Sequence, residues 1–165
     1  MRKNEKFNMG QEIERKFLVN HHKWQQLEKP TGQVYRQGYL LLDPQKTIRI
    51  RLATAQAFLT IKGITVGTTR SEYEYEIPVD DAKELLDQFS VSELSKIRYK
   101  IIFENKTWEV DVFLGDNSGL IIAEIELQRE DEVFAIPPWV DREVTEDEKY
   151  LNANLTIKPY KDWAV

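Results

Sequence analysis

The chain has 165 residues, of which 41% are apolar and 31% are charged, values typical of one folded domain and not of a disordered or membrane protein. It contains no cysteine, which excludes disulfides, zinc–thiolate sites and cysteine nucleophiles and is compatible with a cytoplasmic location. The net charge of -5 argues against a nucleic-acid partner, and the short apolar runs give neither a signal peptide nor a membrane span.

Residues 1–9 are polar and lack periodicity, so we expect a disordered N-terminal extension followed by one domain over residues 10–165. From Gly10 onward apolar and polar residues alternate repeatedly and turn residues break the runs, which predicts many strands and few helices. The eight expected strands lie near 11–19, 34–42, 46–52, 57–63, 68–77, 96–104, 107–114 and 119–128.

Three short helices are expected among these strands. Asn20 can cap a helix that runs to Leu27, and the Asp80–Asp81 pair opens a clearer one that runs to Phe89. Thr145 precedes acidic residues and predicts a short terminal helix. Turn residues at 43–44 and 104–106 make neighbouring strands antiparallel, so the fold class is α+β and is dominated by antiparallel sheet.

Most of the predicted strands carry charged residues on one face and apolar residues on the other, because successive side chains alternate across a strand. In the first strand Glu12, Glu14 and Lys16 share one face, while Ile13 and Phe17 share the other. The signs segregate by strand: Arg49 and Arg51 stand together on one strand, for example, and Glu124 and Glu126 on another.

For any single strand, a charged face that points to water is the better explanation. Segregated signs are costly, however, because like charges two residues apart on one face lie only about 6 to 7 Å from each other. Eight antiparallel strands can close into a barrel. We therefore predict an eight-stranded antiparallel barrel, or tunnel, with a polar charged lumen and with apolar faces turned outward beneath flanking helices.

Such a lumen is stable only if its carboxylates meet cations and its cationic side chains meet anions. Carboxylate clusters offer hard oxygen ligands that suit Mg²⁺ or Mn²⁺ and not zinc: Glu12, Glu14, Glu124 and Glu126. Arginines can contact phosphate through two hydrogen bonds, as Arg49, Arg51 and Arg98 could. A linear triphosphate carries roughly four to five negative charges near neutrality, which suits this basic set.

A series of motifs in chain order resembles the signature of the CYTH, or triphosphate tunnel metalloenzyme, superfamily. The first is Glu-Ile-Glu-Arg-Lys at 12–16, a match to the family's Glu-x-Glu-x-Lys strand. The others are Arg-Gln-Gly-Tyr at 36–39, Arg-Ile-Arg at 49–51, Thr-Ile-Lys at 60–62, Arg-x-Glu-x-Glu at 70–74, Lys-x-Arg at 96–98, Glu-Val-Asp at 109–111, Glu-Ile-Glu at 124–126 and Val-Thr-Glu-Asp at 144–147. Together they cover nearly the whole chain from residue 10, and the short bacterial triphosphatases of the family are the most similar branch.

The resemblance implies metal-dependent hydrolysis of a linear triphosphate, most simply inorganic tripolyphosphate to pyrophosphate and phosphate. An adenylyl cyclase, a nucleotide or thiamine triphosphatase and a non-catalytic polyphosphate-binding module stay open as alternatives, as does a homodimer. In this interpretation the substrate-binding residues are Lys16, Arg49, Arg51, Lys62, Arg70 and Arg98. The metal ligands are Glu12, Glu14, Glu72, Glu74, Asp111, Glu124 and Glu126, for Mg²⁺ or Mn²⁺. The resemblance also implies catalytic roles for Tyr39 and Lys96, although the general base is left undecided.

Overall fold

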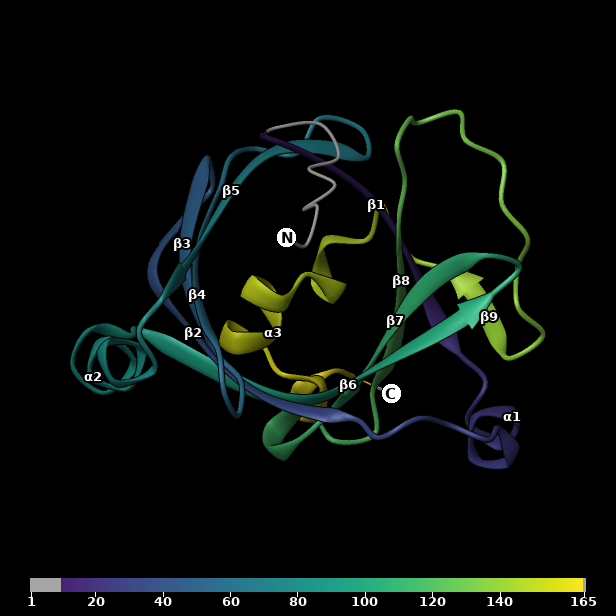
Figure 1. Ribbon diagram of the computed structural model, residues 1–165, viewed down its shortest axis with the longest axis horizontal. Coiled ribbons are helices and arrows are strands. Elements are labelled where there is room, and N and C mark those ends of the chain that lie inside the picture. Colours follow the sequence, from purple (N-terminus) through teal and green to yellow (C-terminus); the bar gives the residue numbers. More distant parts are fainter. Residues whose placement is uncertain (1–9, 165) are drawn as a thin grey trace, which may run out of the picture.

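The structure, a computed structural model, describes residues 10–164. Its strands form a closed ring when the molecule is viewed down its shortest axis (Figure 1). The eight strands of the ring are β1 (Gln11–Val19), β2 (Gln33–Asp43), β3 (Lys46–Leu52), β4 (Ala57–Lys62), β5 (Thr69–Ile77), β6 (Ser92–Phe103), β7 (Lys106–Phe113) and β8 (Ile121–Glu126). Every pairing is antiparallel, in the order β5-β4-β3-β2-β6-β7-β8-β1, and β1 also pairs with β5. The predicted eight-stranded antiparallel barrel is confirmed.

The first strand closes the barrel because its two halves pair with different neighbours. Residues 11–13 of β1 pair with β5, which places Glu12 opposite Arg70, and residues 14–18 pair with β8, which places Lys16 opposite Glu124. A ninth strand that the sequence analysis did not predict, β9 (Val140–Glu143), pairs with the far end of β1. β1 therefore joins β5 to β8 and brings the lumen residues of these two strands together.

The apolar faces of most strands turn outward, as predicted, and pack beneath helices and loops. The largest cluster covers β1, β6, β7 and β8, where Trp24 of α1 (His21–Gln26) packs against Trp139, which in turn packs against Trp108. Helix α2 (Val79–Phe89) covers the opposite side of the barrel through Leu86, which packs with Ile50. The outer face of β5 is an exception to the expected cover, since Tyr73 and Tyr75 are 53% and 57% exposed.

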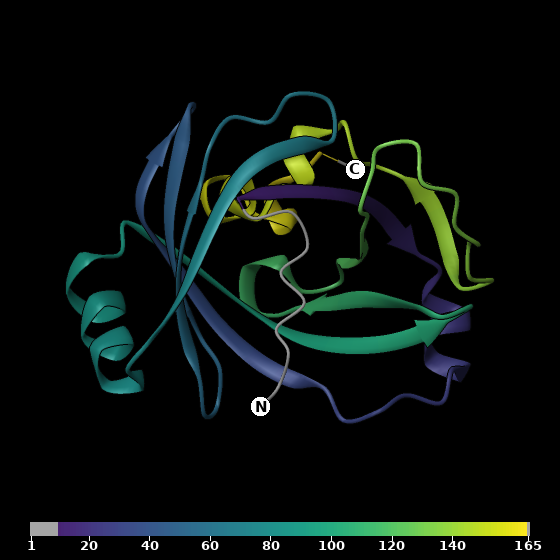
Figure 2. The same ribbon diagram turned by 45° about the horizontal axis from the view of Figure 1, so that its top comes forward.

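The C-terminal segment enters the barrel and does not pack on its outside. It contains the 3-10 turn η2 (Glu148–Tyr150), helix α3 (Asn152–Ile157) and the 3-10 turn η3 (Tyr160–Asp162), and α3 lies within the ring of strands (Figures 1 and 2). Leu155 and Tyr150 pack against Leu94, Phe113 and Ile122 in a buried apolar cluster. This cluster fills one part of the lumen and leaves the charged part beside it.

The terminal helix expected directly after Thr145 lies later in the chain, because residues 148–150 form the turn η2 and α3 begins at Asn152. The other element boundaries agree with the predictions to within a few residues, apart from β6. That strand begins at Ser92, four residues earlier than expected, because residues 92–95 continue the pairing with β2. Asn20 caps α1 as predicted by accepting a 3.0 Å hydrogen bond from the Lys23 amide. The expected disordered extension at 1–9 lies outside the described residues. Among residues 10–164, none of the helices reaches the length and hydrophobicity that a membrane crossing requires.

Candidate active site

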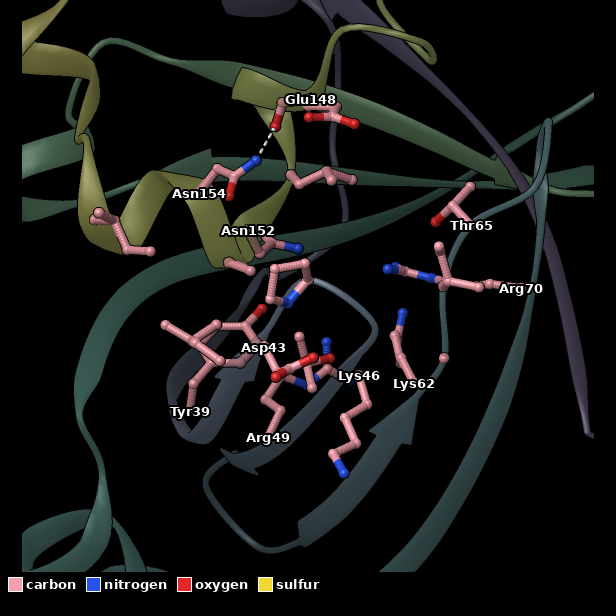
Figure 3. Close-up of a pocket in the computed structure, with 18 of the residues that line it drawn as sticks. Tyr39, Asp43, Lys46, Arg49, Lys62, Thr65, Arg70, Glu148, Asn152 and Asn154 are labelled. Atoms are coloured by element: carbon pink, nitrogen blue, oxygen red, sulfur yellow. Dashed lines mark hydrogen bonds between the residues drawn. The ribbon is translucent and has the colours of Figure 1, made fainter.

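A cavity of about 730 Å³ opens between the barrel wall and the C-terminal segment. Basic side chains from four strands line it: Lys16 of β1, Arg49 of β3, Lys62 of β4 and Arg70 of β5. Figure 3 shows Arg49, Lys62 and Arg70 directed towards this space on one side, with Asn152 and Asn154 of α3 on the other. The strand alternation that predicted a charged lumen thus brings four of the six predicted substrate-binding residues to one cavity.

Carboxylates deeper in the barrel pair with these cavity cations. Lys16 Nζ donates to Glu14 at 2.7 Å and to Glu124 at 2.5 Å. Glu12 accepts from Lys62 Nζ at 2.8 Å and from Arg70 Nε at 2.7 Å. Burial opposes ionisation of Glu12, but Lys62 and Arg70 outweigh it and hold the pKa of Glu12 well below its usual value. Glu12 is therefore ionised, and it compensates the charges of Lys62 and Arg70.

A second network lies in the interior of the barrel around Asp111, which is fully buried. Its carboxylate accepts from Lys96 Nζ at 2.6 Å and from Arg98 Nε and Nη2 at 2.7 Å each. Burial lowers the pKa of Lys96 to about 8, and Arg98 adds to this effect while Asp111 opposes it. The pKa of Asp111 is lowered despite its burial, because Arg98 and Lys96 both stabilise the carboxylate.

Tyr39 lines the cavity, and its phenol is buried. Burial raises the pKa of Tyr39, and the nearby charges of Arg49, Arg70 and Lys16 only partly offset this. The positive charge that a tyrosine base needs is present, but burial outweighs it and the phenol stays protonated at neutral pH. Tyr39 can therefore donate a hydrogen bond into the cavity.

The remaining predicted basic residues, Arg51 and Arg98, do not line the cavity and lie deeper in the lumen. Both contact the ring of Tyr35, whose centroid lies 5.1 Å from the Arg51 guanidinium carbon and 5.6 Å from that of Arg98. Arg51 also lies 3.4 Å from Glu74, which stands 3.6 Å from Arg49. Both arginines are thus held by stacking and ion pairs behind the residues that form the cavity surface.

Negative charge accumulates where β1 meets β8. Glu14 and Glu126 are direct cross-strand partners, and Glu109 stands opposite Glu124 on the next pair. Burial, followed by the charges of Glu12, Glu14 and Glu109, raises the pKa of Glu126 to about 7. Burial likewise raises the pKa of Glu72 to about 7, with Lys62 opposing and Glu12 adding to the effect.

This acidic region matches a divalent cation in donor chemistry, since carboxylate oxygens are what Mg²⁺ and Mn²⁺ prefer. Across residues 10–164 the side chains do not converge in groups of three or more His, Asp or Glu that could hold a metal as they stand. Glu14 and Glu124 are turned towards Lys16, while Glu126 lies opposite Glu14, and burial together with the charges of Glu12, Glu14 and Glu109 raises its pKa. The donor set therefore fits a hard cation once Lys16 releases its two carboxylates.

Several cavity residues were missed by the sequence reasoning. Lys46, Asn152 and Asn154 line the cavity, as do Thr145 and Glu146 of the motif at 144–147, which had been noted without a role. Lys46 stands at the end of a strand next to a turn, and the two asparagines lie on a helix whose place inside the barrel no local pattern indicates. Only the motif at 144–147 gave a signal that could have been used.

Comparison with known proteins bears on this site. The family model of the CYTH domain matches residues 10–159. The chain belongs to the CYTH domain family. This confirms the family resemblance drawn from the Glu-x-Glu-x-Lys strand and its companion motifs.

Two relatives within the CYTH domain family are named inorganic triphosphatases. The chain is 50% identical over 156 residues to the one from Acetivibrio thermocellus, covering 94% of this chain and 99% of the relative. It is 36% identical over 155 residues to the one from Nitrosomonas europaea, covering 88% and 97%. The crystal structure of an inorganic triphosphatase superposes with a TM-score of 0.62 at 33% identity over 88% of this chain and 94% of that one. A conserved hypothetical protein from Pyrococcus furiosus, at 21% identity and a TM-score of 0.58 over 73% and 80% of the two chains, shares the fold alone.

Proposed function

We propose that this protein is an inorganic triphosphatase that hydrolyses tripolyphosphate to pyrophosphate and phosphate with the help of Mg²⁺ or Mn²⁺. The observation that carries the proposal is the cavity in which Lys16, Arg49, Lys62 and Arg70 converge from four strands. A short polyanion is the ligand that such a set of cations binds best. The two relatives named inorganic triphosphatases, similar over nearly their whole length, support the same activity.

Substrate binding is assigned to the cavity cations first. Arg49 and Arg70 can each hold two phosphoryl oxygens, while Lys16 and Lys62 act as mobile point charges. Arg51 and Arg98 lie deeper, so we assign them to the end of the triphosphate that enters furthest. Asn152 and Asn154 of α3 face the cations across the cavity (Figure 3) and leave room for a linear chain of phosphates.

Glu14, Glu124 and Glu126 are the proposed metal ligands, because they lie together where negative charge is in excess. A bound divalent ion would neutralise phosphate charge and lower the pKa of a coordinated water. The other predicted ligands are engaged by cations in the structure: Glu12 by Lys62 and Arg70, Glu72 by Lys62, Glu74 by Arg49 and Arg51, and Asp111 by Lys96 and Arg98. Those four carboxylates can reach a metal only if these pairs open, and we propose that they chiefly orient the substrate-binding cations.

The catalytic roles proposed for Tyr39 and Lys96 differ because their pKa values shift differently. Lys96, with a pKa of about 8, has a neutral fraction near physiological pH and can accept a proton from water. Tyr39 keeps its proton, so its role is to donate a hydrogen bond that orients a phosphoryl oxygen. A cytoplasmic location and a homodimer stay predictions from the sequence.

Phosphate release from tripolyphosphate, ATP and thiamine triphosphate, each with Mg²⁺ and with Mn²⁺, tests the proposal. We expect tripolyphosphate to be hydrolysed fastest and chelation by EDTA to stop turnover. Glu14→Gln should abolish the metal-dependent reaction, whereas Glu143→Gln, on the outer surface, should leave it intact. Formation of cyclic AMP from ATP, or binding of tripolyphosphate without phosphate release, would contradict the assignment in favour of a cyclase or a binding module.

A further inference from the structure

Gln37 is a buried side chain to which neither the sequence motifs nor the proposed mechanism gives a role. It is fully buried in the middle of β2, and neither its Oε1 nor its Nε2 has a hydrogen-bond partner. Its neighbour Gly38 faces outward, since a side chain there would collide with Leu86 of α2. Alternation along the strand therefore turns Gln37 into the lumen, on the same face as Tyr35 and Tyr39.

Positively charged residues surround this amide on the two neighbouring strands. The register places Arg51 of β3 directly opposite Gln37, and Arg49 and Lys96 occupy diagonal positions on β3 and β6. Tyr39, one step along the same face, lines the cavity together with Arg49. Gln37 therefore lies just beneath the surface that the proposed substrate would touch.

Unpartnered buried polar atoms concentrate at this point. Within residues 10–164, four buried side-chain nitrogen or oxygen atoms lack a hydrogen-bond partner: two belong to Gln37, one is Arg49 Nε and the fourth is Trp108 Nε1 in the outer apolar core. A buried amide without partners destabilises a fold, so its presence calls for an explanation. Two adjacent residues whose donors face no acceptor fit a ligand that brings acceptors with it.

We propose that Gln37 contacts the reacting phosphoryl group, an inference that rests on the proposed triphosphatase function. Its Nε2 and the Nε of its diagonal neighbour Arg49 donate to phosphoryl oxygens, and the Oε1 of Gln37 accepts from the water that attacks the phosphorus. The water oxygen forms the new P–O bond, and the bond to the bridging oxygen breaks with its electron pair leaving on pyrophosphate. The proton of the attacking water passes to an oxygen of the phosphate product, so that pyrophosphate and phosphate leave with all atoms accounted for. Gln37 itself exchanges no proton and holds the water in line.

Replacement of the amide by a side chain of similar shape tests this role. Gln37→Met keeps the length and volume but removes both polar atoms. With tripolyphosphate and Mn²⁺ we expect kcat to fall about 100-fold or more, as is typical when one donor to developing charge is removed. KM should change much less, because the cavity cations still bind the substrate. The melting temperature should be no lower than that of the wild type, because Gln37 has no hydrogen bond to lose.

Trp108→Phe is the matched control, since it removes the other unpartnered buried group from a place outside the lumen. We expect this variant to lose some stability and to keep the wild-type kcat. Gln37→Glu keeps the length, loses the donor and adds a carboxylate beside Arg51 and Arg49, so it should lower kcat at least as much and also raise KM. It serves if the methionine variant does not fold. A wild-type kcat in either Gln37 variant overturns the inference. A loss of activity that is fully explained by the fraction of unfolded protein in the variant overturns it as well. Absence of phosphate release by the wild-type protein overturns the proposed function instead.

Discussion

The buried charge network around Asp111 gives the sharpest prediction about stability. Asp111 accepts three hydrogen bonds, one from Lys96 and two from Arg98, and no solvent reaches it. Asp111→Asn keeps the shape of the side chain but removes the only charge that both cations contact. It also turns an amide donor towards groups that can only donate. The variant therefore leaves the buried ammonium group of Lys96 without its hydrogen-bonded carboxylate, while Arg98 keeps its pairs with Glu109 and Glu124.

The cost of breaking such a buried pair by removing one partner is about 3–5 kcal/mol. In a protein of this size each kcal/mol lowers the melting temperature by about 2–4 °C, so the expected loss is about 6–20 °C. The loss should be greater at low pH. In the folded wild type Lys96 has a pKa of about 8, and without Asp111 this pKa falls further. In the folded variant Lys96 therefore loses its proton at a pH at which the unfolded chain still keeps it. The free energy of unfolding of the variant then rises with pH. The difference in melting temperature between the variant and the wild type therefore narrows between pH 6 and pH 9.

Thermal denaturation of both proteins at pH 6, 7.5 and 9, followed by circular dichroism, measures this difference. Glu143→Gln is the control, because Glu143 pairs with Arg15 through two short hydrogen bonds at the surface. An exposed pair of this kind is worth about 0–1 kcal/mol, so its removal should change the melting temperature only slightly at every pH. A loss for Asp111→Asn no larger than that of the control, or one that grows with pH, would refute the reasoning.

Three further predictions concern binding, metal and catalysis. Lys46→Ala should raise KM for tripolyphosphate several-fold at low salt and hardly at all at high salt. Lys46 is an exposed cavity cation, so salt screens its attraction for the triphosphate, and KM measured at two ionic strengths checks this. Glu126 has a raised pKa, so its ionised form destabilises the protein as pH rises through about 7. Glu126→Gln should therefore raise the melting temperature at pH 8 in EDTA. Added Mn²⁺ should raise the melting temperature of this variant less than that of the wild type, and thermal shift measurements with and without Mn²⁺ test both expectations. Tyr39→Phe should lower kcat without moving the pH profile, because the phenol is protonated throughout the range; a shifted profile would restore Tyr39 as a base.

The barrel could be predicted from the sequence because its signal is local. Charged and apolar residues alternate with a period of two in most of the barrel strands, β2 excepted, and that period fixes which residues face the lumen. The short strand β9 carries no such signal, since its four residues are Val, Asp, Arg and Glu. The acidic residues after Thr145 predict a terminal helix, but α3 begins only at Asn152. Its place inside the barrel depends on Leu155 meeting Leu94 and Phe113, residues far away in the sequence. Contacts of that kind have no local pattern.

The candidate site was predictable in composition and only partly in arrangement. Strand faces identified which charges enter the lumen, yet they could not show that Lys16 and Arg49 reach the cavity while Arg98 is held behind it by Asp111. The register of β6 and β7 places Arg98 opposite Asp111, and the closure of the barrel through β1 and β5 brings Glu12 beside Arg70. Gln37 was overlooked for another reason: a neutral residue does not stand out among charged ones, and its missing hydrogen bonds are visible only in three dimensions.

The pairing of lumen charges also suggests why metal and triphosphate would depend on each other. Lys16 cannot turn fully towards a phosphate while it holds Glu14 and Glu124, and those two carboxylates cannot turn towards a cation while they hold Lys16. Release of either side alone would leave buried charge without compensation, which is costly in a confined lumen. Simultaneous release transfers the lysine to the phosphate and the carboxylates to the metal, so every charge keeps a partner. We therefore expect metal and triphosphate each to increase the affinity for the other. Lys16→Met frees the two carboxylates beforehand, so it should strengthen metal binding in the absence of triphosphate. It should also weaken the coupling between the two ligands, which calorimetric titrations measure. Equal metal affinity in the presence and absence of a non-hydrolysable triphosphate would show that these pairs do not exchange partners.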